Sequence, residues 1–528
     1  MTFLPNHTLR RARVPLPLCL AALLVVTGPL RAGTPPTTLV LDTARITPTA
    51  GVRIDRGAAP DGTDALVFNG TAEGGVPFPV SDDELKRLPG TELSVSFWVR
   101  IDRIAESRIG LGCRIPQHRQ PRQAPIIVDA GTVATAFGSY NIYSPVEQPL
   151  ATGAWHHVAF TYSMSNLTFA TYYDGIPQRC GTLTPDIPAP VAVSSLLGPL
   201  GGKPFTGAIG GVRLWNRALP AEALLRFRPS PAAARALAAP LTAAASDTPH
   251  APFRQWCTAL AAEAKAGEPV SLRRWQFIAG VTRDLPTLAS WARPLATGRL
   301  ARAPFLATSI YPYDHEKRLP FRLPHDGTPT DTLETALARG EYESLSFMLH
   351  PLRNIGRLEI KAAPPRNEKG ATLPVESLDI RIVKCWFNPA SGWNTYFGGG
   401  REFPTLAPEL LLYDDALVKV DTDNRANYLR VDYRSGSRYV DISRYGTPST
   451  VPPFNYVRDP VADAPGPLPL PLPLTEGRNQ QFWVTVHAPS NAAPGTYTTE
   501  ITLTADGAAA GSLQLSATVR PYLLPRPM

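Results

Sequence analysis

Aromatic side chains gather in one glycine-punctuated segment of this 528-residue chain. The segment reads CWFNPASGWNTYFGGG over residues 385–400 and contains Trp386, Trp393 and Tyr396. Aromatic rings with an apolar face and a polar edge suit stacking on sugar rings. The pattern therefore indicates Trp386, Trp393 and Tyr396 as ligand-binding residues. The alternatives left open are that these rings fill the end of a sandwich or contact another domain.

Paired histidines and paired carboxylates are the remaining groups with catalytic potential. Adjacent strand residues point to opposite faces, so His156 and His157 are not expected to bind one ion together. Asp414–Asp415 and Asp421–Asp423 are predicted to be turn and surface carboxylates. Nothing in their spacing holds a pair at the roughly 5 Å or 6.5–9.5 Å that glycoside hydrolysis needs. We therefore predict no catalytic residue.

Metal and disulfide sites are only weakly indicated. A calcium site needs about six to eight converging oxygens, and the loop carboxylates Asp42, Asp61 and Asp64 show no such spacing. Calcium remains a candidate cofactor with no ligand assigned. Cys113 and Cys180 fall in one predicted domain, where a disulfide and two buried thiols remain equally open.

Residues 1–33 have the features of a secretory signal. Arg10, Arg11 and Arg13 precede the apolar run 16–26, which is shorter than the roughly 20 residues that span a bilayer. Since residues 1–33 contain four arginines and no acidic residue, removing them lowers the net charge from +8 to +4. We expect a secreted, periplasmic or cell-surface protein with no nucleic-acid partner and no membrane span after cleavage; an uncleaved anchor is the alternative.

Strand patterns dominate the rest of the chain. The 57 prolines suit short strands joined by loops. The side chains of residues 93–99 alternate with the period of two that is typical of a strand, and Asp174–Gly175 predicts a hairpin turn. These patterns predict a mainly β fold with a jelly roll over 34–230 and a second antiparallel sandwich over 301–528. Between them, a helical linker over 231–300 is expected, divided into short helices by Pro269, Pro286 and Pro294.

The first of these domains resembles a known family. The segments ALVFNG, LSVSFWVR, GAWHHVAFTY, YYDGIPQ and FTGAIGGVRLWNRALPAEAL occur in the order and spacing of the laminin G-like, concanavalin-type jelly rolls. The resemblance implies binding of carbohydrate or protein ligands, sometimes with calcium.

The second domain resembles the sandwich that precedes the catalytic barrel in secreted proteins of the glycoside hydrolase family 123 type. The segments QQFWVTVHAPSNAAPGTYTTEITL and VRPYLLP carry this resemblance, but the sequence stops at Met528, where such proteins continue into a barrel. We therefore expect an exported protein that binds polysaccharide or glycan. The alternatives are the non-catalytic part of a glycoside hydrolase and an adhesion module that binds a cell-surface protein.

Overall fold

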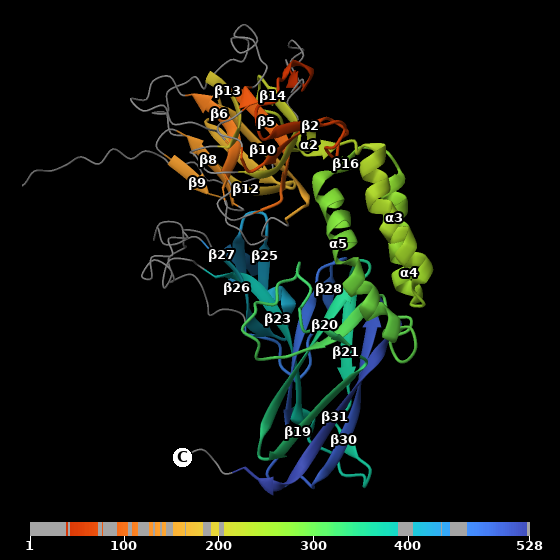
Figure 1. Ribbon diagram of the computed structural model, residues 1–528. Coiled ribbons are helices and arrows are strands. Elements are labelled where there is room, and N and C mark those ends of the chain that lie inside the picture. The colour runs from red at the N-terminus through yellow and green to blue at the C-terminus, as the bar shows by residue number, and fades with distance from the viewer. Residues whose placement is uncertain are drawn as a thin grey trace, which may run out of the picture.

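The computed structural model describes residues 38–40, 43–71, 76–77, 92–103, 108–114, 126–129, 132–137, 140–143, 152–163, 165–182, 192–199, 205–388, 405–433, 436–443 and 462–524. Within this part of the chain the fold is mainly β, as predicted, with a jelly roll at one end and a second sandwich at the other (Figure 1). Helices connect the two domains along one side.

The jelly roll contains two antiparallel sheets. In sheet order, the larger one contains β12 (Ile176–Thr182), β11 (Thr168–Tyr173), β10 (Trp155–Ser163), β5 (Glu92–Ile101), β14 (Thr206–Trp215), β3 (Ala65–Asn69) and β2 (Val52–Asp55), with β1 (Thr38–Val40) paired to β14. The smaller one contains β4 (Val76–Pro77), β13 (Ala192–Pro199), β6 (Arg108–Arg114), β7 (Ile126–Asp129), β8 (Thr132–Phe137) and β9 (Tyr140–Tyr143). The pairing of β5 with β14, far apart in sequence, closes the domain.

Alternation along β5 places neighbouring aromatic rings on opposite faces of the larger sheet. Phe97 pairs with Val158 of β10, and both side chains are fully buried. Trp98 lies on the other face, where its ring centroid is 4.9 Å from that of Phe227 beneath the helices. The period-two alternation of residues 93–99 thus divides these two rings between the core and a neighbouring layer.

The connecting segment forms long helices. Its elements are α2 (Ala221–Leu224), β15 (Arg226–Phe227), α3 (Pro231–Asp247), α4 (Ala251–Lys265), β16 (Val270–Ser271) and α5 (Leu272–Leu295). The prediction that Pro286 and Pro294 divide this region is wrong, because both lie inside α5. An interior proline costs about 3 kcal/mol, but the face of α5 that includes Leu288 and Trp291 is buried against neighbouring elements and offsets that cost.

The second sandwich contains two large sheets and one small one. One large sheet contains β18 (Thr328–Pro329), β17 (Phe305–Ile310), β20 (Tyr342–Pro351), β29 (Gln480–His487), β23 (Leu378–Asn388) and β24 (Thr405–Leu412). The other contains β19 (Thr332–Arg339), β31 (Ala508–Leu523), β30 (Gly495–Ala505), β21 (Ile355–Ala362) and β28 (Leu472–Leu474), with β22 (Arg366–Asn367) paired to β30. The small sheet contains β25 (Val418–Asp421), β26 (Ala426–Tyr433) and β27 (Gly436–Asp441). Among the described strands only β19 and β31 pair in parallel.

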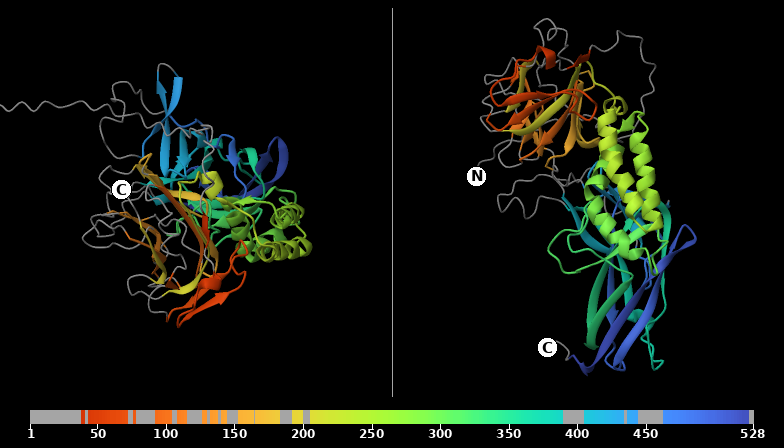
Figure 2. Two further views of the ribbon diagram at one scale, coloured as in Figure 1. Left: turned by 90° about the horizontal axis from the view of Figure 1, so that it is seen from above. Right: turned by 45° about the vertical axis from the view of Figure 1, so that its right-hand side comes forward.

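The helices share their core with the second sandwich. One continuous apolar cluster contains Phe253 and Ile278 from the helices together with Phe305 and Phe482 from the strands. Figure 2 shows α3 to α5 extending from this sandwich toward the jelly roll. The helices and the second sandwich therefore form one packed unit, on which the jelly roll rests. No helix among the described residues is sufficiently long and apolar to cross a membrane.

Candidate functional site

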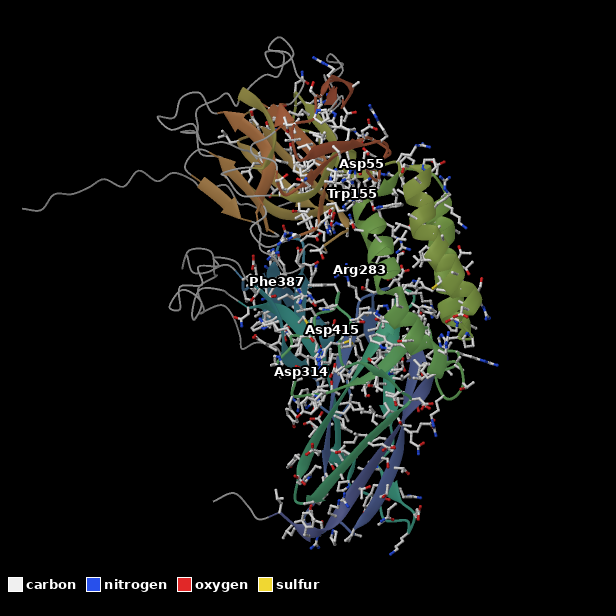
Figure 3. All side chains as sticks on the ribbon, in the orientation of Figure 1. Asp55, Trp155, Arg283, Asp314, Phe387 and Asp415 are labelled. Carbon is white, nitrogen blue, oxygen red and sulfur yellow. The ribbon has the colours of Figure 1, made fainter. Side chains whose placement is uncertain are left out.

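A cleft of about 1240 Å³ lies where the jelly roll, α5 and the second sandwich meet. Its walls combine aromatic rings with charged and amide side chains. Figure 3 marks three of its lining residues: Trp155 on the jelly roll, Arg283 on α5 and Phe387 on the sandwich. Ligand sites commonly lie in concave spaces between domains and combine apolar surface with a few polar groups.

The β11–β12 hairpin forms the jelly-roll side of the cleft. Its turn residues, Asp174 and Gly175, have φ angles of 48° and 79°, in the left-handed region that aspartate and glycine tolerate. The Asp174 carboxylate is buried, accepts the backbone N–H of His157 at 2.7 Å and accepts the Gln276 amide at 2.8 Å. The predicted hairpin turn is confirmed, and its side chain also joins the jelly roll to α5.

Arg273 connects all three walls of the cleft. Its Nε donates to the carbonyl oxygen of Gly175 at 2.9 Å, and its Nη2 donates to Asp423 Oδ2 at 2.9 Å. Asp423 lies in the turn between β25 and β26. A single side chain from α5 therefore fixes the distance between the jelly-roll hairpin and the small sheet of the sandwich.

The loop before β29 forms the sandwich side. Gly477 has a φ of 66°, and a Cβ there would lie 2.3 Å from Phe277 Cε2, so only glycine fits beside that ring. The next residue, Arg478, places its guanidinium 5.9 Å from the centre of the Phe321 ring. Phe321 packs in turn against a buried cluster that includes Phe387. The rings of Phe321 and Phe387 therefore form an apolar floor of the cleft, and the Arg478 guanidinium lies over the Phe321 ring.

His350 lies behind this floor and is buried. Its Nδ1 is 2.7 Å from Asn479 Oδ1, while the Asn479 amide nitrogen donates to the Arg322 carbonyl oxygen. Asn479 Oδ1 therefore acts as acceptor, which assigns the proton to His350 Nδ1. Burial lowers the pKa of His350 and keeps the ring neutral.

The two histidines of β10 lie on opposite faces, as predicted. His156 Nδ1 is 2.7 Å from Asp174 Oδ2, and its ring stacks on Tyr173. His157 packs against the edge of Trp98 with ring centroids 5.0 Å apart. Burial, followed by the nearby positive charge of Arg213, lowers the pKa of His157 to about 3. Both histidines pack as structural residues and do not converge on an ion.

The predicted aromatic site is only partly within the described residues. Trp386 lies on β23 and donates from Nε1 to Glu409 Oε2 at 2.9 Å, outside the cleft. Trp393 and Tyr396 lie outside the described residues, so their role remains a prediction. The same is true of the Cys113–Cys180 disulfide, whose side chains also lie outside the described part.

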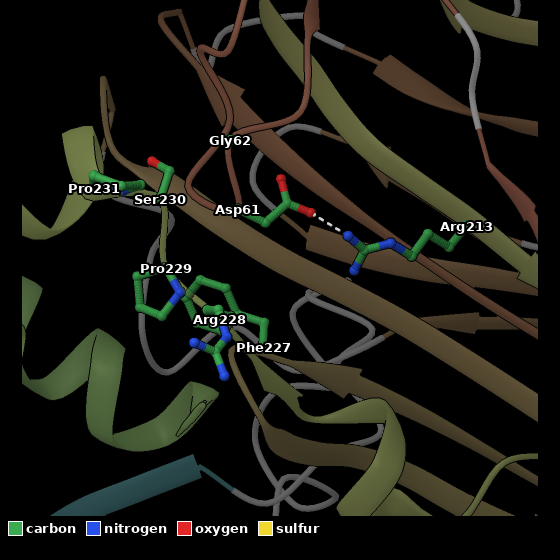
Figure 4. A pocket seen from close by; sticks show the side chains of 8 residues that line it. All are labelled: Asp61, Gly62, Arg213, Phe227, Arg228, Pro229, Ser230 and Pro231. Atoms are coloured by element: carbon green, nitrogen blue, oxygen red, sulfur yellow. Dashed lines mark hydrogen bonds and ion pairs between the residues drawn. The ribbon is translucent and has the colours of Figure 1, made fainter. Parts of the chain in front are cut away.

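The carboxylates considered for metal binding are engaged by donors from the chain. Asp61 accepts Arg213 at 2.7 Å, and Asp64 accepts the Thr43 hydroxyl at 2.6 Å; Asp42 is outside the described residues. Figure 4 shows the Asp61–Arg213 pair in a smaller recess of about 350 Å³.

Of the acidic pairs on the sandwich, Asp421 at the end of β25 and Asp423 in the turn between β25 and β26 are turn residues, as predicted, but Asp423 lines the cleft and pairs with Arg273. Asp414 and Asp415 differ from the predicted surface groups, because their side chains are only 13% and 25% exposed and bind basic side chains. Asp414 Oδ2 accepts Arg430 at 2.9 Å.

One further group, Asp314, His325 and Asp326, brings metal-ligating atoms within 4.8 Å of one another. The buried Arg318 already provides a cation there. Its Nη2 is 2.7 Å from Asp314 Oδ2 and 2.8 Å from Asp326 Oδ1. This guanidinium balances both carboxylates, so the group is best described as an ion-pair cluster.

The cleft was missed from the sequence because its residues are distant in the chain. Gln276 contacts Asp174 across 102 positions, and Arg273 contacts Asp423 across 150. The hairpin signal at Asp174–Gly175 was visible, but nothing local showed what the turn touches. Arg478 follows a glycine in a loop, which alone indicates no function.

Comparison with known proteins identifies the fold of the first domain. Residues 69–224 match the family model Laminin_G_3, described as the concanavalin A-like lectin/glucanases superfamily. No curated protein sequence matches the chain.

Solved structures that are similar to parts of the chain include a glycoside hydrolase, a sialidase and one domain of an arabinanase. A family 123 glycoside hydrolase from Clostridium perfringens is 12% identical, with a TM-score of 0.22, over 37% of this chain and 24% of that one. Domain 4 of a GH43 extracellular arabinanase from Geobacillus stearothermophilus, in complex with arabinotriose, is 20% identical (TM-score 0.22) over 36% of this chain and 85% of that one. Trypanosoma rangeli sialidase in complex with sialic acid is 18% identical (TM-score 0.26) over 34% and 32%.

The chain thus spans only about a quarter to a third of the two enzymes. The family match and the two-sheet topology agree on the first domain, which is a concanavalin A-like jelly roll of the lectin and glucanase superfamily.

Proposed function

We propose that this protein is an exported, non-catalytic glycan-binding protein and that it binds a polysaccharide chain in the interdomain cleft. The observation that carries the proposal is the composition of the cleft. Half-buried aromatic rings, Phe277 and Phe321, lie beside amide and guanidinium donors in a space of about 1240 Å³. Sugar rings offer apolar C–H faces and hydroxyl edges, which such walls can contact together.

The rigidity of the cleft supports this proposal. Arg273 and Gln276 hold the jelly roll against the sandwich through bonds of 2.8–3.0 Å. A cleft whose walls are fixed before binding loses little conformational freedom when a ligand enters. Most of the conformational entropy lost on binding then comes from the flexible polysaccharide.

The test is affinity electrophoresis of the purified protein in gels that contain soluble xylan, arabinan, β-glucan or polygalacturonate. Retardation in at least one gel is expected. Phe321→Ala should weaken that binding about tenfold, which corresponds to about 1.4 kcal/mol. Tyr522→Ala is the matched control, because Tyr522 is an exposed ring on β31 outside the cleft. Equal binding by both variants, or no retardation in any gel, would reject the cleft as a glycan site.

Export is the second part of the proposal. It is supported by the basic start and short apolar run of residues 1–33. Cell fractionation should find the protein outside the cytoplasm, shortened at its amino terminus, and a version lacking residues 1–33 should stay inside. Recovery of the full-length protein in the membrane fraction would favour the uncleaved anchor instead.

A further inference from the structure

Arg478 differs from the neighbouring arginines of the cleft in its contacts. Arg273 is paired with Asp423 at 2.9 Å, and Arg283 is paired with Asp284 at 2.8 Å. The guanidinium of Arg478 has no carboxylate within ion-pair distance among the described residues, and its contact is the Phe321 ring. A cation in a cleft that lacks its own counter-ion is suited to an anion from outside.

The backbone on both sides of Arg478 is fixed. The Gly477 N–H donates to the Pro351 carbonyl oxygen at 2.8 Å, and the Asn479 N–H donates to that of Pro320 at 2.7 Å. The Asn479 side chain is held by His350 as well. The guanidinium is therefore presented from a loop whose backbone is fixed, so that little backbone freedom remains to be lost on binding.

The charge of the cleft also favours an anion. Five arginines and three aspartates line it. Burial, and next the positive charge of Arg273, lower the pKa of Arg478. The negative charge of Asp423 opposes this shift in the pKa of Arg478, but the Asp423 carboxylate already binds Arg273.

We propose that the cleft selects an acidic glycan and that Arg478 binds the anionic oxygens of that glycan, while Phe321 supports the guanidinium from below. This inference rests on the proposed function, because it places the glycan in the same cleft. A sugar carboxylate and a sugar sulfate share this chemistry, since each presents two or more oxygens to the guanidinium fork.

The test compares polymers that differ only in the anionic group. The intact protein is titrated by isothermal calorimetry with polygalacturonate and carboxyl-reduced polygalacturonate, and with chondroitin sulfate and its desulfated form. We expect at least tenfold tighter binding of one acidic polymer than of its neutral or desulfated counterpart. The polymer pair that shows the difference in affinity identifies whether the protein binds a sugar carboxylate or a sugar sulfate.

Variants then assign the effect to Arg478. Arg478→Gln should remove the preference and retain the weaker binding of the neutral polymer. Arg478→Lys should restore part of the preference, because it keeps the charge but loses the two-pronged geometry. Arg53→Gln is the control, since Arg53 is an exposed arginine on β2 that pairs with Asp55 and is not part of the cleft. Unfolding temperatures verify that all variants fold.

The two proposals fail in different ways. Equal binding of acidic and neutral polymers by the native protein would overturn the acidic selection and leave glycan binding in place. Retention of the acid preference by Arg478→Gln would overturn the role of this residue. Absence of binding to every polymer would overturn the proposed function itself.

Discussion

Replacing Asp174 with alanine is expected to destabilise the jelly roll and loosen its contact with α5. Four losses contribute, and the first is the 2.7 Å hydrogen bond between His156 Nδ1 and Asp174 Oδ2. The buried N–H of His157 loses its acceptor, which costs about 1–3 kcal/mol. Alanine at a φ of 48° costs roughly 1–2 kcal/mol more. The Gln276 amide loses one of its two acceptors, at about 0.5–1.5 kcal/mol. Because removal of the buried carboxylate also relieves its own desolvation, we expect a net loss of about 3 kcal/mol.

Asp506 provides a matched control. It also precedes a glycine in a hairpin turn and has a φ of 53°, but its side chain is 39% exposed and makes no contact with the jelly roll. Asp506→Ala should therefore lose about 1–2 kcal/mol, mainly from the backbone conformation. Asp174→Asn should be milder than Asp174→Ala, because asparagine tolerates this conformation and keeps one acceptor oxygen.

Urea unfolding followed by tryptophan fluorescence measures the free energy of unfolding. Small-angle X-ray scattering measures the radius of gyration, which increases when the two domains separate. We expect a lower unfolding midpoint and a larger radius of gyration for Asp174→Ala only. If Asp174→Ala and Asp506→Ala lose the same free energy and leave the scattering unchanged, the turn does not join the domains and the reasoning fails.

Three further predictions concern the interior of the protein. Because the pKa of His157 is about 3 in the folded chain, against the ordinary 6.5, unfolded chains bind an extra proton below pH 6.5. The free energy of unfolding should thus be highest above pH 6.5 and decline toward pH 3, with a loss of about 2 kcal/mol at pH 5. His157→Gln should flatten this part of the pH profile of urea midpoints. An unchanged slope would contradict the assignment. Gly477→Ala should cost about 2–4 kcal/mol, through its positive φ and the Phe277 ring, whereas Gly370→Ala, with open space around it, should lose only the backbone part. Added Zn²⁺ or Ca²⁺ should leave the unfolding temperature of the native protein unchanged. Arg318→Ala should lower the unfolding temperature and make it respond to metal, because Asp314 and Asp326 lose their cation. A metal response of the native protein would show that the guanidinium does not fill the site.

The fold was readable from local patterns to a large extent. Alternation in β5 and β10 predicted the sheet faces correctly, as the opposite faces of His156 and His157 in β10 show. The helical region differs from the prediction, because Pro286 and Pro294 do not interrupt α5. Within α5, tertiary packing of residues such as Trp291 outweighs the local cost of Pro286.

The candidate site was not readable from the sequence. The sequence predicts stacking residues where aromatic side chains cluster, but Trp386 instead donates a hydrogen bond to Glu409 on the neighbouring strand. The cleft arises only when Asp174, Arg273 and Arg478 meet across three parts of the chain. No local pattern encodes such a meeting, because it depends on how whole domains dock.

The Asp174–Gly175 turn also bears on how these domains can be exchanged between proteins. Hairpin tips usually accept insertions, since they face water. Here a Cβ on Gly175 would lie 3.1 Å from the backbone nitrogen of Arg273, so the tip fits against the first turn of α5. A foreign jelly roll grafted before residue 231 would need a two-residue turn at this position to dock on α5 at the same angle. The interchangeable unit is therefore the jelly roll together with the helix surface that receives it.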